Sequence, residues 1–87
     1  MLGWRTIHVR PGRTAHGWRT TVQGDGAGWP DIFAVRSGGA IAAELKSSTG
    51  KLAAEQDAWL YDLAAAGVEV HLWRPADYPD AIAEALR

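Results

Sequence analysis

The sequence of 87 residues contains no cysteine, which excludes a disulfide framework and a zinc site built on thiolates. It also has no apolar run close to the roughly 18 residues that span a bilayer. The first residues, Met1 to Arg5, lack the apolar centre of a secretory signal peptide. We therefore expect an intracellular, cytoplasmic protein with one modest core, since a domain of this size buries only about 60% of its unfolded surface.

Acidic residues are scarce in the first part of the chain, where none precedes Asp25. Up to Lys51 there are seven basic and three acidic residues, a balance of +4, whereas from Leu52 onward two basic residues face seven acidic ones, a balance of −5. The total net charge of −1 therefore hides a basic front half. Such a half suits a surface that faces phosphates, and an ordinary solvated surface explains it equally well.

Hydrophobic periodicity predicts a small α/β (α+β) domain that occupies residues 1–87. Alternating or β-branched patterns typical of strands cover residues 4–10, 18–23 (more weakly), 31–36, 40–46 and 68–73. Helical spacing covers residues 52–66, which end before Gly67, and residues 78–86. A strand followed by a helix and another strand is a βαβ crossover. We therefore expect a mixed sheet with a central hairpin, flanked by helices.

The hairpin carries the residues whose chemistry points most clearly to a function. If Gly38-Gly39 forms the turn, Asp31 lies opposite Lys46, and Glu44 lies on the diagonal from Asp31 on the same face of the sheet. Two carboxylates and a backbone carbonyl, here that of Leu45, are oxygen ligands suited to Mg²⁺ or Mn²⁺. Lys46 could then orient a water molecule and balance charge on a phosphate. The alternative is an ordinary polar strand end, with Asp31 in a turn after proline.

These residues resemble a known nuclease pattern. Pro30-Asp31 followed by Glu44-Leu45-Lys46 is similar to the Pro-Asp…Asp/Glu-x-Lys motif of the PD-(D/E)XK nuclease superfamily. A wider set of residues resembles its VRR-NUC branch, the virus-type replication and repair nuclease domain. That wider set comprises Gly28-Trp29, Gly50-Lys51-Leu52, Gln56, Trp59-Leu60, Gly67, Val70 and Trp73-Arg74-Pro75. The likeness extends over nearly the whole chain from Leu2.

The resemblance implies a restriction-endonuclease-like core and Mg²⁺- or Mn²⁺-dependent hydrolysis of DNA, often at branched structures or Holliday junctions, in bacterial or phage-type replication and repair. It implies catalytic positions at Asp31, Glu44, Lys46 and the helical Gln56, although an exposed helix residue is the simpler explanation of Gln56 from the sequence alone. The chain departs from the family at its front, because such domains open with a helix that carries an acidic metal ligand. No acidic residue stands there in this chain.

Two further expectations concern partners. Nucleic acid would contact basic and hydroxyl side chains of the front half, namely Arg5, His8, Arg10, Arg13, Arg36, Ser47 and Lys51. Without a front helix, apolar surface around Trp4, Ile7 and Trp18 would be uncovered, which favours a homodimer or higher homo-oligomer. A catalytically weak or inactive DNA-binding module of the same fold stays open as an alternative, as does an assembly protein in which the acidic pair is accidental.

Overall fold

A four-stranded mixed sheet forms the body of the protein in the computed structural model, which describes residues 3–9, 12–14, 17–19 and 27–87, and side chains only within 3–9 and 27–87. The strand order is β1-β4-β5-β6. The strands are β1 (Arg5–His8), β4 (Ile32–Arg36), β5 (Gly39–Leu45) and β6 (Glu69–Trp73). A second sheet pairs β2 (Gly12–Thr14) with β3 (Gly17–Arg19). The α/β class and the mixed sheet with a central hairpin are confirmed.

The turn of the central hairpin differs from the predicted one. Arg36 pairs with Gly39, so the turn consists of Ser37-Gly38 and not of Gly38-Gly39. Of the two glycines, only Gly38 has a positive φ, of 91°, and Gly39 begins β5. A register shifted by two residues keeps every side chain on its face, so hydrophobic patterning could not separate the two turns.

The helix α1 (Ala54–Ala65) connects β5 to β6, and these two strands pair in parallel. This confirms the predicted βαβ crossover. The helix has 12 residues and about three turns, so it is shorter at both ends than the segment predicted over residues 52–66. It ends where Gly67, at a φ of 95°, reverses the chain before Val68. The helix predicted over residues 78–86 is shorter as well, since α2 spans Asp80–Ala85. It is preceded by the 3-10 helix η1 (Pro75–Asp77), which was not predicted.

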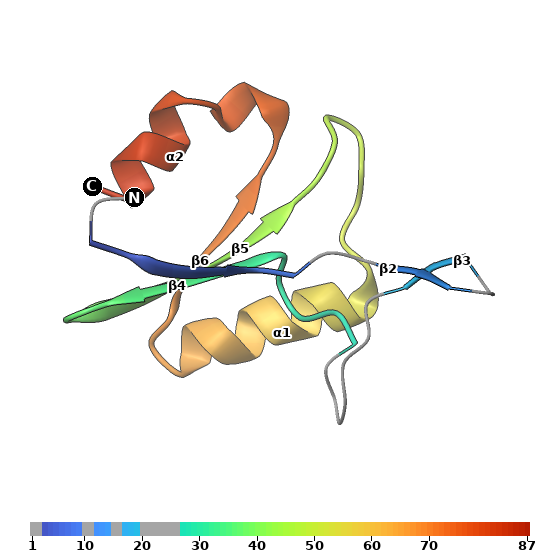
Figure 1. The fold of residues 1–87 in the computed structure, drawn as a ribbon, viewed down its shortest axis with the longest axis horizontal. Helices are drawn as coiled ribbons and strands as arrows, with labels where there is room; N and C mark the ends of the chain where they lie inside the picture. The colour runs from blue at the N-terminus through green and yellow to red at the C-terminus, as the bar shows by residue number, and fades with distance from the viewer. Residues whose placement is uncertain (1–2, 10–11, 15–16, 20–26) are drawn as a thin grey trace.

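The two helices lie on opposite faces of the sheet, so that β5 and β6 run between them (Figure 1). The central strand β5 carries half of the buried residues described, and Leu60 of α1 and Trp73 of β6 close the core on its two sides. Within residues 3–9 and 27–87, and apart from Pro30, the buried apolar side chains are Ala34, Ile41, Ala42, Ala43, Leu60 and Trp73. Three of the six are alanines, whose small side chains allow neighbouring elements to approach β5 closely.

The first strand is exposed along its whole length, although the alternation of apolar and polar residues over 4–10 predicts a half-buried strand. It pairs with the outer side of β4, whereas α1 packs against β5 and β6. Ile7 is therefore 61% exposed, and Val35 on the same face of β4 is 39% exposed. Trp4 does not belong to this uncovered surface, and the side chain of Trp18 lies outside the described residues. The homo-oligomer stays a prediction.

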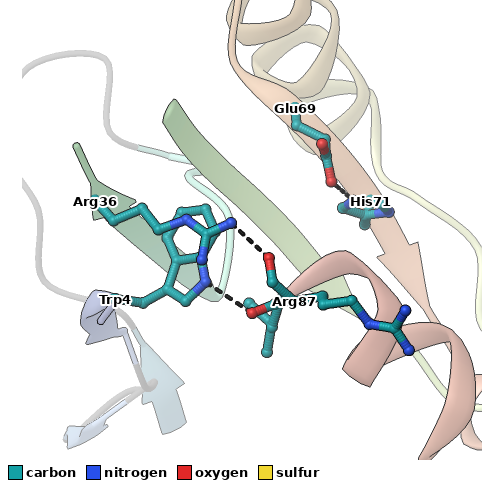
Figure 2. Close-up of polar contacts among 6 residues, drawn as sticks. Trp4, Arg36, Glu69, His71 and Arg87 are labelled. Atoms are coloured by element: carbon teal, nitrogen blue, oxygen red, sulfur yellow. Dashed lines mark hydrogen bonds and ion pairs between the residues drawn. The ribbon is translucent and has the colours of Figure 1, made fainter. Parts of the chain in front are cut away.

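Trp4 joins the beginning of β1 to the end of α2 (Figure 2). Its indole Nε1 donates a hydrogen bond to the carbonyl of Leu86 at 3.0 Å. The guanidinium of Arg36 lies 4.3 Å from the centroid of the Trp4 ring and donates to the carbonyl of Arg87 at 2.5 Å. A cation over an indole ring is a favourable arrangement. These contacts therefore hold the end of α2 against the turn end of the β4–β5 hairpin. None of the helices described is long and apolar enough to cross a membrane.

The segment that leads into β4 is fixed by the start of α1. Gly28 has a φ of 85°, and a Cβ built there would lie 2.6 Å from the carbonyl carbon of Glu55. Trp59 of α1 donates from its indole to the carbonyl of Ala27 at 3.1 Å and packs edge-on against Trp29, with ring centroids 5.0 Å apart. The contact between this segment and α1 places Pro30, which is fully buried, and hence Asp31.

We expect Gly28→Ala to lower the free energy of unfolding by more than about 2 kcal/mol, because it adds an overpacked contact with backbone to the strain of a positive φ. Gly38→Ala is the matched control, since Gly38 has a similar φ of 91° and a Cβ built there would have no atom within 4 Å. It should cost only the backbone strain, about 1 kcal/mol. Urea unfolding measures both, and equal losses in the two variants would contradict the close packing of Gly28 against α1.

Candidate active site

Asp31 lies at the start of β4, where the sheet holds its backbone and its side chain. Its carbonyl accepts a hydrogen bond from the Val9 N–H at 2.8 Å, which extends the pairing of β1 with β4 by one residue. Its carboxylate Oδ2 accepts from the Leu45 N–H at 2.8 Å. Since Ile32 pairs with Ala43, the next position places Asp31 opposite Glu44. The prediction that Asp31 faces Lys46 is therefore wrong, and the two carboxylates are direct neighbours instead of diagonal ones.

Glu44 is the one charged residue among the buried ones that the structure describes, with only 2% of its surface exposed. Its Oε1 accepts a hydrogen bond from Nε2 of Gln56 at 2.9 Å. Its Oε2 is buried and has no hydrogen-bond partner. A buried carboxylate oxygen without a partner is costly, so a proton or a cation beside Oε2 would stabilise the site.

Gln56 uses both ends of its side-chain amide. Its Oε1 accepts a hydrogen bond from the Ala53 N–H at 2.8 Å, which satisfies a free donor at the beginning of α1, while its Nε2 reaches Glu44. The orientation of the amide is thereby determined, because only nitrogen can donate to the carboxylate. The predicted contact of Gln56 with the acidic pair is present, and the simpler explanation of an exposed helix residue is wrong.

The environment of Glu44 favours its protonated form. The pKa of Glu44 is raised from 4.5 to about 7, and burial is the largest cause. Asp31 adds to the increase, because its carboxylate would accept a proton held by Glu44 and repels a charged Glu44. The charge of Lys46 and the backbone of Asp31 act in the opposite direction. Burial penalises the charged form of any carboxyl group, and a second carboxylate nearby adds repulsion. A carboxyl group that titrates near neutrality is unusual and marks a candidate functional site.

Lys46 follows β5 directly and is half-buried. Its N–H donates to the carbonyl of Trp73 at 3.0 Å, which continues the pairing of β5 with β6 past Leu45. Alternation along β5 places the side chains of Lys46 and Glu44 on the same side of the sheet, and the positive charge of Lys46 lowers the pKa of Glu44. The side chain of Leu45 points to the opposite face and is 39% exposed.

The residues proposed to bind nucleic acid are scattered. Ser47 and Lys51 follow the site in sequence and are exposed. His8 pairs with Ile32, which places its side chain on the face opposite to Asp31. Arg5 pairs with Val35 at the far end of the hairpin, and Arg36 is engaged at that same end by Trp4 and Arg87. The side chains of Arg10 and Arg13 lie outside the described residues.

The acidic pair is a minimal donor set for a metal ion. Within residues 3–9 and 27–87 no group of three or more His, Cys, Asp and Glu side chains is placed to hold a metal. Two carboxylates, a backbone carbonyl and water molecules are nevertheless a donor set of the kind that Mg²⁺ accepts. The unpartnered Oε2 of Glu44 beside the Asp31 carboxylate is the observation that fits such an ion.

The sequence did not predict the contacts of Arg74, the residue that directly follows β6. Its Nη1 donates to the carbonyls of Ser47 at 2.6 Å and Gly50 at 2.7 Å. The signal was present in the predicted βαβ unit, because parallel strands end at the same edge of a sheet. A residue after β6 must therefore lie near the residues that follow β5.

Comparisons of the chain with protein-family models, with curated proteins and with solved structures found no match. The site is thus described by its geometry alone: a buried acidic pair, a glutamine that holds one of the two carboxylates, and a lysine beside them.

We expect the metal-free protein to lose stability as the pH rises through 7. The pKa of Glu44 is higher in the folded state, about 7, than its ordinary value of 4.5, so folding favours the protonated form. That stabilising contribution is complete below pH 4.5 and disappears as the pH passes 7, and its full size is on the order of 3 kcal/mol. Urea unfolding in EDTA between about pH 5 and pH 8 measures the loss.

Glu44→Gln should flatten this dependence and make the protein more stable at about pH 8, because a neutral amide has no charged form to bury. Glu55→Gln, at an exposed position of α1, is the matched control and should retain the decline. An equal decline in wild type and Glu44→Gln would show that another group controls the pH dependence.

Proposed function

We propose that this chain is a metal-dependent nuclease that hydrolyses DNA phosphodiester bonds at the site of Asp31, Glu44 and Lys46. The observation that supports this most strongly is the carboxylate of Glu44, which is buried at 2% exposure and leaves Oε2 without a partner beside a second carboxylate. Burying an acidic pair reduces stability unless a proton or a bound cation offsets the repulsion. The proton leaves Glu44 as the pH rises through about 7, whereas a bound cation would still offset the charge.

Asp31, Glu44 and the carbonyl of Leu45 are the groups that would hold Mg²⁺ or Mn²⁺. Oxygen ligands and two negative charges match the preferences of a hard divalent cation, which keeps several of its water molecules. When bound, such a cation polarises a phosphate oxygen and lowers the pKa of a coordinated water. A donor set of only two carboxylates favours one ion and loose binding.

The remaining groups have roles that follow from their contacts. Gln56 holds Oε1 of Glu44 and leaves Oε2 without a hydrogen-bond partner. Lys46 carries a positive charge beside the acidic pair, where it can donate a hydrogen bond to a phosphate oxygen or orient an attacking water. The backbone N–H of Leu45 keeps one oxygen of Asp31 in place. The chain would thus supply the metal ligands, the ammonium group of Lys46, and hydrogen bonds that hold the two carboxylates in place for hydrolysis.

The proposal predicts cleavage of DNA that requires Mg²⁺ or Mn²⁺ and stops in EDTA. Asp31→Asn and Glu44→Gln should each lower the single-turnover rate by about 100-fold or more, because each removes charge that the site needs in the transition state. Branched and linear duplexes of the same length serve as substrates, and far-ultraviolet circular dichroism verifies the fold of each variant.

Glu69→Gln is the matched control for that experiment. Glu69 forms an ion pair with His71 at 2.6 Å on β6, away from the acidic pair, and its replacement removes the same charge (Figure 2). It should leave cleavage unchanged. Cleavage by Glu44→Gln at the wild-type rate would refute the site. Salt-dependent DNA binding by a wild-type protein that cuts nothing in either metal would support the inactive DNA-binding module instead.

DNA affinity should fall with salt, because each neutralised phosphate releases condensed counterions. Lys51 is exposed and close in sequence to the site, so Lys51→Gln should reduce the log-log salt slope by about one unit. Arg87→Gln removes a charge whose partner is Glu84 at 3.3 Å and should leave the slope unchanged. Fluorescence anisotropy at several salt concentrations measures the slope, and an unaltered value in Lys51→Gln would place the DNA surface elsewhere.

A further inference from the structure

The turn that follows Lys46 is held closed by the side chain of Arg74, the residue directly after β6. Within the turn, the Gly50 N–H donates to the Ser47 Oγ at 3.0 Å and to the Ser47 carbonyl at 3.3 Å. The carbonyls of Ser47 and Gly50, at its two ends, both accept from Nη1 of Arg74. Hydrogen bonds from a guanidinium are charge-assisted and stronger than neutral ones, so one nitrogen atom ties the two ends together.

Arg74 is itself fixed by the end of β6. Its backbone N–H donates to Asp77 Oδ2 at 2.8 Å, and the preceding residue, Trp73, accepts the N–H of Lys46 through its carbonyl at 3.0 Å. The same short stretch of backbone therefore holds Lys46 through Trp73 and the following turn through Arg74. Any displacement of the turn would have to occur against both attachments.

The turn in its closed form lies beside the side chain of Lys46. A Cβ built on Gly50 would lie 3.6 Å from Cδ of Lys46, which is ordinary van der Waals distance. The aliphatic stem of Lys46 thus runs beside Gly50, while its ammonium group acts on Glu44. A long side chain with four rotatable bonds keeps one position only where its stem is packed.

We infer that Arg74 is a positioning residue for Lys46: by closing the turn of residues 47–50, it holds the lysine stem so that the ammonium group stays beside the acidic pair. This inference rests on the proposed function only for its catalytic consequence. The placement of Lys46 by Arg74 can be tested whether or not the protein cuts DNA.

The chain has only two lysines, Lys46 and Lys51, which makes amine labelling a direct test. Limited acetylation of the folded protein, followed by mass spectrometry, gives the extent of Lys46 modification relative to the exposed Lys51. Arg74→Gln should raise this ratio several-fold, because the lysine stem is no longer held. Arg74→Met keeps a long side chain but has no hydrogen-bond donor for the two carbonyls, and should raise the ratio as well.

Arg87→Gln, which removes a solvent-exposed arginine, should leave the labelling ratio as in wild type. Circular dichroism selects the variants that fold, and Arg74→Met carries the test if Arg74→Gln does not fold. An unchanged ratio in a folded Arg74 variant overturns the inference.

Single-turnover cleavage at saturating DNA supplies the catalytic readout. Arg74→Gln should lower the rate by about 10-fold to 100-fold, as expected for a misplaced catalytic group, with the Kd for DNA unchanged. A loss confined to the Kd would make Arg74 a phosphate contact and overturn the positioning role. Absence of cleavage in the wild-type protein would refute the proposed nuclease activity, while the labelling ratio would still decide the role of Arg74.

Discussion

The burial of Glu44 on the central strand is the constraint on which the site depends. Strand β5 lies between an antiparallel and a parallel neighbour and beneath α1, so a carboxylate near its end is 2% exposed. Hydrophobic packing fixes that strand, and the acidic group is carried into the interior with it. Gln56, Asp31 and Lys46 then surround a group that titrates near neutrality, and Oε2 is left for a proton or a cation. A less buried glutamate at this position would be an ordinary solvated charge.

The elements around β5 serve this site from three directions. The segment of residues 27–30 packs against α1 through Gly28 and two tryptophans, and it delivers Asp31. The beginning of α1 delivers Gln56, whose amide also caps the helix. The end of β6 delivers Arg74 to the turn after Lys46. The opposite end of the sheet is closed separately by Trp4, Arg36 and the end of α2, far along the strands from the acidic pair.

Much of this arrangement was predictable because its causes are local. Alternation along residues 31–36 and 40–46, helical spacing before Gly67 and the βαβ order predicted the mixed sheet and placed the acidic pair and Lys46 on one face. The exposure of β1 was not predictable, because it depends on α1 packing against β5 and β6 while leaving the outer side of β4 uncovered. The unsuspected engagement of Arg36 by Trp4 and a C-terminal carbonyl likewise joins residues far apart in the chain.

The sequence by itself determined the strand and helix periods, and with them the face on which Asp31, Glu44 and Lys46 lie, because side chains alternate strictly along a strand. Only the tertiary structure decided which of these residues are opposite one another. A hairpin shifted by two residues preserves every face, so patterning allows both registers, and the turn at Ser37-Gly38 selects the one that pairs Asp31 with Glu44. The tertiary structure also decided the charge state, because the pKa of Glu44 depends on burial beneath α1 and on neighbours that sequence spacing does not reveal.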